Sequence, residues 1–371
     1  MKKFMLFATA VGLTLTSCVN DEETTMMGSR SVIAFDAPAM KTSRANVHGE
    51  IIGVQYPTTE NFKVFSKIYT NGYKGWAASE NIADYFAAAG DDAKHEGGSY
   101  WSTTPTTYYW PDAGYNLAFA AYSPAELGTA CNGVTNIERT AAGFQFTDFV
   151  SEPVSDDQYD LMYSHTVYDR NKSNNASSAV SLKFEHALSS IVFSSQKSDA
   201  AVNYEIIDVK VTGKFYTKGD FNQGITETTS TEGVYTENEA PKWDLTNETT
   251  TEVNYVPTFT AFNVPAATPE IFTQGTSAIL AIPQDVPTDA TVHVTYKKTT
   301  NGTTTQHTAS ILLLDFKKAA VDGTTVADGI ATWERGKRYV YRIAFGENQR
   351  IYFEPSVTEW VQEPTLIYTI K

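Results

Sequence analysis

The sequence predicts an all-β protein with few short helices, organised as two β-sandwiches. Thr, Tyr, Val, Ile and Phe recur in short alternating runs that Gly, Asn, Asp and Pro interrupt, and this pattern favours strands over helices. The chain has 371 residues, of which 42% are hydrophobic and 13% aromatic, so it can fill more than one core. A long polar run near its middle divides the strand-rich sequence into two parts.

The first expected strand spans residues 31–37, where Ile33 and Phe35 lie on one face. The main helix candidate follows at residues 80–89. Ser79 can cap this helix, alanines favour it, and Gly90 would end it.

A hairpin is expected over residues 292–296 and 308–314, because the turn dipeptide Asn301-Gly302 lies between these two β-prone runs. A second hairpin is expected near the C-terminus, from residues 338–345 and 350–357.

The polar run at residues 169–178 contains no residue that suits a core, so we place the domain boundary there. This gives an N-terminal domain at residues 45–175 and a C-terminal domain at residues 176–371, each long enough for one β-sandwich. The Thr- and Glu-rich stretch at residues 226–251 is expected to be a surface loop or an exposed hairpin, because strand patterns resume on both sides of it.

The N-terminus has the pattern of a bacterial lipoprotein signal peptide at residues 1–17. Lys2 and Lys3 precede a short apolar run that ends in Leu-Thr-Ser-Cys, with Cys18 as the first residue of the mature chain. A lipid on Cys18 would attach the protein to a membrane without a spanning helix. The alternative is an ordinary secretory signal followed by an incidental cysteine.

Bulk charge narrows the range of partners. The chain has 28 Lys and Arg against 43 Asp and Glu, a formal net charge of −15, which repels phosphate backbones and excludes nucleic acid as an expected partner. With Cys18 carrying lipid, Cys131 has no partner for an intramolecular disulfide. Cys131 is expected to be a small buried residue, with a reactive or intermolecular thiol as the alternative.

No sequence motif indicates an active site, a cofactor or a metal centre, so we expect a protein that is not an enzyme. Asp156, Asp157 and Asp160 are the best calcium candidates, but they lack the pattern of an EF-hand, and a solvated acidic loop is the preferred interpretation. His186 is expected to be a hydrogen-bonded residue at a strand end. The rival enzyme hypothesis is a surface glycosidase with carboxylates from distant parts of the chain.

An aromatic cluster offers an alternative binding function. Tyr100, Trp101, Tyr108, Tyr109 and Trp110 would suit a surface glycan-binding lipoprotein if their rings were exposed. The preferred interpretation assigns them to the core, because an apolar strand pattern follows directly.

Several short segments, taken in chain order, resemble the fimbrillin family of Bacteroidales, the subunits of type V pili. The matching segments are residues 109–111, 117–124, 160–163, 180–189, 281–284, 333–341 and 357–360. The resemblance implies two tandem transthyretin-like β-sandwich domains and a lipidated (palmitoylated) Cys18. It also implies export to the outer membrane, the cell surface and a fimbrium that supports cell adhesion. Expected partners are copies of the chain or related pilins, outer-membrane lipid, and a host or bacterial surface receptor.

The family also implies proteolytic processing after an arginine, which removes the lipidated leader together with the first strand. Arg44-Ala45 stands where that cut would fall, so the leader would be residues 18–44; Arg30 is the competing site, and a solvated linker arginine is the alternative for Arg44.

Removal of the first strand would open an apolar groove with unpaired backbone groups, a template for another chain. The C-terminal run at residues 365–371 can donate a strand, because Leu366, Tyr368 and Ile370 share one face. Head-to-tail exchange of this kind builds a filament. The alternative for the C-terminal run is an ordinary last strand of its own domain.

Overall fold

The computed structural model describes residues 31–37, 50–51, 56–95, 97–98, 100–128, 133–175, 178–229, 235–266, 268–316, 329–346 and 351–360. Within these residues nearly all regular structure is β. The exceptions are one short α-helix, α1 (Lys172–Asn175), and three 3-10 turns, η1 (Ser155–Asp157), η2 (Gly275–Ser277) and η3 (Leu313–Asp315). The all-β prediction is confirmed.

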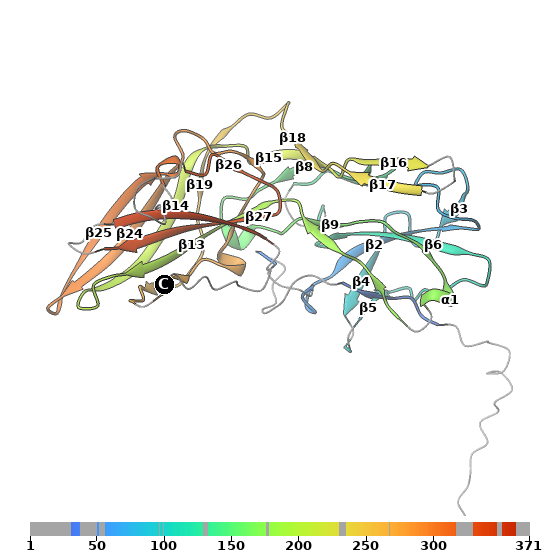
Figure 1. The fold of residues 1–371 in the computed structure, drawn as a ribbon, viewed down its shortest axis with the longest axis horizontal. Helices are drawn as coiled ribbons and strands as arrows, with labels where there is room; N and C mark the ends of the chain where they lie inside the picture. The colour runs from blue at the N-terminus through green and yellow to red at the C-terminus, as the bar shows by residue number, and fades with distance from the viewer. Residues whose placement is uncertain are drawn as a thin grey trace, which may run out of the picture.

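One end of the elongated molecule is formed by a ten-stranded and a four-stranded sheet, here called the first sandwich (Figure 1). The ten-stranded sheet has the order β11-β1-β5-β4-β2-β6-β9-β12, with β3 on β2 and β10 on β6. Its strands are β1 (Ala34–Asp36), β2 (Phe62–Tyr69), β3 (Asn81–Asp84), β4 (Asp91–His95), β5 (Trp101–Thr104), β6 (Asn116–Ser123), β9 (Met162–Ser164), β10 (Val167–Arg170), β11 (Val180–Ser181) and β12 (Phe184–His186). The four-stranded sheet, ordered β18-β15-β8-β7, comprises β7 (Asn136–Thr140), β8 (Gly143–Val150), β15 (Lys218–Asn222) and β18 (Lys242–Asp244).

The other end is formed by two five-stranded sheets, here called the second sandwich. The first sheet, β21-β13-β27-β28 with β22 on β13, comprises β13 (Ser189–Lys197), β21 (Glu270–Ile271), β22 (Ile279–Ala281), β27 (Lys337–Phe345) and β28 (Ile351–Glu359). The second, β19-β14-β24-β25 with β20 on β14, comprises β14 (Asn203–Phe215), β19 (Thr251–Tyr255), β20 (Phe262–Asn263), β24 (Thr291–Thr300) and β25 (Thr303–Leu312). Two short pairs complete the described strands: β16 (Ile225–Thr229) with β17 (Tyr235–Glu239), and β23 (Gln284–Asp285) with β26 (Thr332–Trp333).

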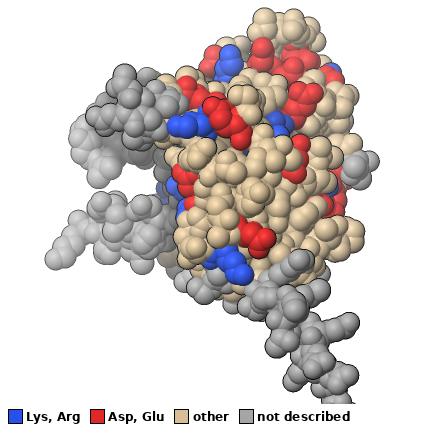
Figure 2. Space-filling view, turned by 90° about the vertical axis from the view of Figure 1, so that its right-hand side faces the viewer, with Lys and Arg blue, Asp and Glu red and all other residues tan. Residues whose placement is uncertain are grey.

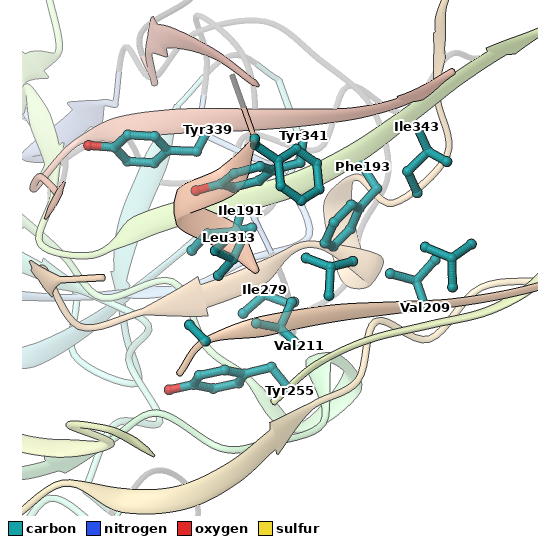
Figure 3. Close-up of a cluster of buried hydrophobic side chains, with 14 of the residues drawn as sticks. Ile191, Phe193, Val209, Val211, Tyr255, Ile279, Leu313, Tyr339, Tyr341 and Ile343 are labelled. Atoms are coloured by element: carbon teal, nitrogen blue, oxygen red, sulfur yellow. The ribbon is translucent and has the colours of Figure 1, made fainter. Parts of the chain in front are cut away.

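Each sandwich has its own apolar core. In the second sandwich, alternate residues of β13 and β27 meet alternate residues of β14 and β24, as Figure 3 shows for Phe193, Tyr341 and Val211. In the first sandwich, Phe65 on β2 meets Phe144 on β8 at a ring-centroid distance of 5.5 Å. A further cluster lies on the opposite face of the ten-stranded sheet, around β1. The period-2 alternation of the sequence is what fills these layers.

Strands from both sides of the predicted boundary contribute to the first sandwich. β11 and β12 belong to its ten-stranded sheet, and β15 pairs with β8 across a long sequence separation. The division of the chain into residues 45–175 and 176–371 stays a prediction.

Both predicted hairpins are confirmed. β24 and β25 pair in continuous register around Asn301 and Gly302, whose φ angles of 49° and 78° suit a two-residue turn. β27 pairs with β28. The polar stretch after residue 225 contains the β16–β17 hairpin.

The predicted helix at residues 80–89 is wrong. Asn81–Asp84 forms β3 and pairs with β2, placing Asp84 2.6 Å from Lys67 in an ion pair. Pairing with an existing strand outweighs the weak helix propensity of this short segment. Among the described residues, no helix is long and apolar enough to cross a bilayer.

Candidate functional site

The first strand lies inside its sheet, with a neighbour on each side. β1 is antiparallel to β5, where Phe35 faces Trp101, and parallel to β11, where Phe35 faces Val180. A strand in this position satisfies backbone groups of two other strands at once.

Backbone hydrogen bonds extend this pairing beyond β1 at both ends. They run from Ile33 N–H to the Tyr108 carbonyl (2.9 Å), from Trp110 N–H to Ser31 (3.0 Å), from Leu182 N–H to Asp36 (2.8 Å) and from Tyr56 N–H to Ala37 (3.0 Å). Removing residues 31–37 would therefore leave donors and acceptors unpaired on two facing walls.

The side chains of this strand fill an apolar slot. Ile33 and Phe35 are both fully buried. The ring of Phe35 lies in edge contact with Phe119 at 5.4 Å, Phe86 at 6.2 Å and Phe62 at 6.3 Å. Burial of a large apolar side chain contributes about 1.5–3 kcal/mol, so Ile33 and Phe35 hold the strand strongly. The slot accepts a strand with apolar side chains at alternate positions.

The other predicted assembly residues lie outside the described part of the chain. They are Cys18, Arg44, Ala45, Leu366, Tyr368 and Ile370, together with the competing site Arg30 and with Cys131. Their roles stay predictions.

The first described residues after Arg44 are held at a buried ion pair. Glu50 Oε2 accepts a hydrogen bond from Arg338 Nη2 on β27 at 3.2 Å, Glu50 Oε1 lies 2.9 Å from Arg338 Nε in an ion pair, and Ser190 on β13 also donates to Glu50. Both charged side chains are over nine-tenths buried. Burial raises the pKa of Glu50 even though Arg338 opposes the shift.

A second polar contact joins this segment to the last described residue. The Ile51 N–H donates to Asp160 Oδ2 at 2.9 Å, and Asp160 Oδ1 lies 3.0 Å from His186 Nδ1. The His186 ring stacks on Trp360 with centroids 3.9 Å apart. The chain that enters the fold after the leader and the chain that leaves it toward the C-terminal run therefore meet at one Asp-His pair.

These contacts test two predictions. His186 is hydrogen-bonded at a strand end, as predicted. The solvated-loop interpretation holds for Asp156 and Asp157, which are exposed, but it is wrong for Asp160, which is 2% exposed and engaged by His186. Within the described ranges, no three His, Cys, Asp or Glu residues are grouped to hold a metal ion.

Sequence reasoning missed Glu50 and Arg338 as partners. The available signal was weak: Arg338 lies near the start of β27, whose other residues are mostly apolar, and a buried charge in such a strand needs a partner. Nothing local identifies Glu50 as that partner.

The aromatic cluster belongs mainly to the core. Trp101 and Trp110 are 3% and 5% exposed, and the Trp101 indole N–H donates to the Glu60 carbonyl. Only Tyr100 and Tyr109 present exposed rings. The two indoles are therefore not available for stacking on a sugar.

The end face of the first sandwich carries both signs of charge. Figure 2 shows acidic side chains gathered near its top, with lysine and arginine side chains scattered between neutral residues. This face has no continuous basic patch among the described residues, in line with the net charge of −15.

The fimbrillin-like family model matches residues 60–360, more than half of the 371-residue chain. The chain therefore belongs to the fimbrillin-like family. This is a structural family of adhesion and pilus proteins, not of enzymes, and membership implies a place in a cell-surface appendage.

The solved structures that are similar to this chain have low sequence identity to it. A proposed cell adhesion protein from Bacteroides ovatus is 15% identical, with 90% of this chain and 99% of that chain covered and a TM-score of 0.44. One from Bacteroides uniformis is 12% identical, with 89% and 99% covered and a TM-score of 0.44. A fimbrial assembly protein from Parabacteroides distasonis is 10% identical, with 88% and 98% covered and a TM-score of 0.34. No curated protein matches the chain.

Proposed function

We propose that this protein is a fimbrial subunit that assembles by strand exchange into surface filaments and supports cell adhesion. The observation that carries the proposal is the position of residues 31–37. This segment is paired with a strand on each side, and its side chains Ile33 and Phe35 are fully buried. A terminal strand of this kind can be withdrawn without threading the chain, and its loss leaves a groove that another strand fits.

In this proposal the leader has two tasks. Lipid on Cys18 delivers the subunit to the outer membrane and cell surface, while the first strand keeps the groove closed and prevents early polymerisation. Cutting between Arg44 and Ala45 then separates the strand from the folded chain, and the strand leaves with the lipid. An uncut copy would remain attached to the membrane as an anchor.

The proposed replacement is the C-terminal run of another copy or of a related pilin. Leu366, Tyr368 and Ile370 would enter the slot that Ile33 and Phe35 vacate, while main-chain hydrogen bonds form with β5 and β11. Glu50 and Trp360 support this arrangement, because their contacts fix the chain on the folded side of both exchanging segments. Adhesion to a receptor would then be a property of the filament.

Processing by an arginine-specific protease tests the first step. We expect the wild-type protein to lose its leader and form oligomers that resist dissociation in detergent without heating. Arg44→Gln should abolish both, whereas Arg30→Gln should leave both intact. Oligomers that form equally well from Arg44→Gln would contradict the proposal.

The donor strand is tested on cut protein. Tyr368→Asp places a charge on the face that would enter the groove, and Ile367→Asp places the same charge on the opposite face. We expect Tyr368→Asp to abolish the oligomer ladder and Ile367→Asp to weaken it far less. Equal effects of the two variants, or normal ladders after deletion of residues 365–371, would remove the C-terminal run as donor.

A further inference from the structure

The edges of the sheets differ sharply in how they are protected against pairing. Natural sheets discourage edge pairing with charged side chains, proline or very short strands. Seven of the eight terminal strands in the described sheets of four or more strands follow this rule. The seventh, β11, has only two residues. The other six contain a charged residue or proline: β7 (Glu138, Arg139), β12 (Glu185), β18 (Lys242, Asp244), β19 (Glu252), β21 (Glu270) and β28 (Pro355).

The exception is β25, the outer strand of the β19-β14-β24-β25 sheet. Its ten residues, Thr-Thr-Thr-Gln-His-Thr-Ala-Ser-Ile-Leu, include no charged residue and no proline. Eight of them are exposed, and among the described residues no strand pairs with its outer side. β25 is therefore a long, uncharged and unprotected edge at the tip of the second sandwich (Figure 1).

The hairpin geometry decides which residues face outward. The two-residue turn makes Thr300 and Thr303 a hydrogen-bonded pair, and the register continues without a shift to Leu313, whose N–H donates to Ala290 at 2.7 Å. Odd-numbered residues of β25 thus point their backbone groups at β24. The even-numbered residues point theirs outward: Thr304, Gln306, Thr308, Ser310 and Leu312.

Local charge also distinguishes this hairpin. The chain has 43 acidic residues and a net charge of −15, so most of its surface repels a second copy. Residues 290–314 contain no Asp or Glu at all. Lys297 and Lys298 lie on β24, one strand behind the edge, and Lys297 pairs with Glu205 at 2.7 Å. Two copies can approach along β25 without repulsion between like charges on the strand itself.

We propose that β25 is a lateral docking edge for β25 of a second copy of this chain, paired antiparallel about a two-fold axis. The outward residues must face outward residues, so an even-numbered position pairs with an even-numbered position. The register that uses all five outward residues has Thr308 at its centre, facing Thr308 of the second copy. Gln306 then faces Ser310 of that copy.

A second copy fits this edge better than a different partner does. Four of the five outward residues are polar and the fifth is Leu312, and none of them is charged, so a second copy of the strand meets no like charge there. In the proposed register Thr308 faces Thr308 of the second copy, and a threonine pair across antiparallel strands is favourable by about 0.2–1 kcal/mol. The contact is narrower than a stable interface, which buries about 1,200–2,000 Å². The pairing is therefore weak in dilute solution and gains strength where copies are held close together at a surface.

Cysteine cross-linking tests both the pairing and its register, in uncut full-length protein with Cys18→Ser and Cys131→Ser. Thr308→Cys places two sulfurs at a hydrogen-bonded pair, where Cα atoms lie about 5.5 Å apart, within disulfide reach. The matched control is Thr304→Cys on the same strand and face; its copy would lie about 27 Å away, eight residues at 3.4 Å each. We expect Thr308→Cys to form dimers on the order of tenfold faster, as for a reaction between pre-positioned groups.

Charge variants give a second, independent readout by sedimentation at high protein concentration. Gln306→Lys with Ser310→Glu should strengthen dimerisation, because opposite charges face each other across the axis; Gln306→Lys with Ser310→Lys should weaken it. Equal cross-linking of Thr304→Cys and Thr308→Cys overturns the proposal, and so does equal dimerisation of the two charge variants. Capture of Thr308→Cys solely by another surface protein would assign the edge to that protein instead. Neither test involves cutting at Arg44, so the result is separate from strand exchange.

Discussion

The two sandwiches differ in what happens to their terminal strands. β1, the first described strand, lies inside the first sandwich with partners on both sides. β28, the last described strand, lies at the edge of the second sandwich with β27 as its one partner there. Withdrawing β1 would open a slot between two walls, whereas withdrawing β28 would only expose a new edge. Among the described residues, the slot on which the proposed strand exchange depends therefore lies in the first sandwich.

The strongest test of this difference compares one phenylalanine from each core. Phe35→Ala removes the ring that fills the first-strand slot, and Phe215→Ala removes a ring stacked on Trp333 in the second core, with centroids 5.3 Å apart. In intact protein, each variant should lower the free energy of unfolding by about 3–5 kcal/mol. Denaturant titration measures both.

The two variants should differ in stability after the leader has been cut away. Phe35 leaves with its strand, so Phe35→Ala and wild type should then unfold at the same denaturant concentration. Phe215→Ala should keep its full defect. A persistent defect of Phe35→Ala in cut protein would show that the first strand stays bound.

A second, smaller effect on stability tests the contact between the first sandwich and the β16–β17 hairpin, which comes later in the chain. The β16–β17 hairpin docks on the loop after β2, where Glu227 Oε1 accepts the Trp76 N–H at 3.1 Å and Tyr235 packs on Tyr73 at 4.8 Å. Gly75 has φ of 128°, and a Cβ there would overlap the Glu227 carboxylate. Gly75→Ala should therefore lower the free energy of unfolding by about 1–3 kcal/mol, from backbone strain and crowding.

The matched control is Gly72→Ala in the same loop. A Cβ at Gly72 meets nothing within 4 Å, so this variant should change stability by no more than about 0.5 kcal/mol. Thermal unfolding distinguishes the two. Similar stability of Gly75→Ala and Gly72→Ala would mean that the hairpin does not depend on this contact.

Local sequence patterns predicted those parts of the fold that are decided locally. The Asn301-Gly302 dipeptide specified the β24–β25 turn, and the alternation around Ile33 and Phe35 specified a strand with one buried face. The segment at residues 80–89 failed because its state depends on pairing with β2, which no short-range pattern encodes.

The parts of the fold that local patterns did not predict depend on partners far apart in the sequence. Nothing in residues 218–222 indicates that β15 pairs with β8, because many strands have the same alternation and only the packed core selects one. The Glu50–Arg338 pair and the Asp160–His186 pair were missed for the same reason: each joins residues that only the fold brings together. The burial of Ile33 and Phe35 on one face of a strand follows from local alternation, whereas the anchoring of residues 50–51 and of Trp360 does not.

The smallest predicted effect is a pH dependence at the contact that joins β12 of the first sandwich to β17. His165 lies 2.8 Å from both Glu185 and Glu239, and hydrogen bonds with these carboxylates raise its pKa from 6.5 to about 9. Since the pKa is raised on folding, the contribution is complete below pH 6.5 and is lost as the pH rises through 9. His165 is 39% exposed, so solvent screening keeps the effect below about 1 kcal/mol. His165→Gln should therefore remove a decline in stability between pH 6.5 and 9.

The control is His293→Gln: burial lowers the pKa of His293, so the contribution of His293 to stability changes only below that pH window. Denaturant titrations at intervals across this range measure both differences from wild type. A decline that persists unchanged in His165→Gln would place the titrating group elsewhere and leave the link between β12 and β17 without an electrostatic component.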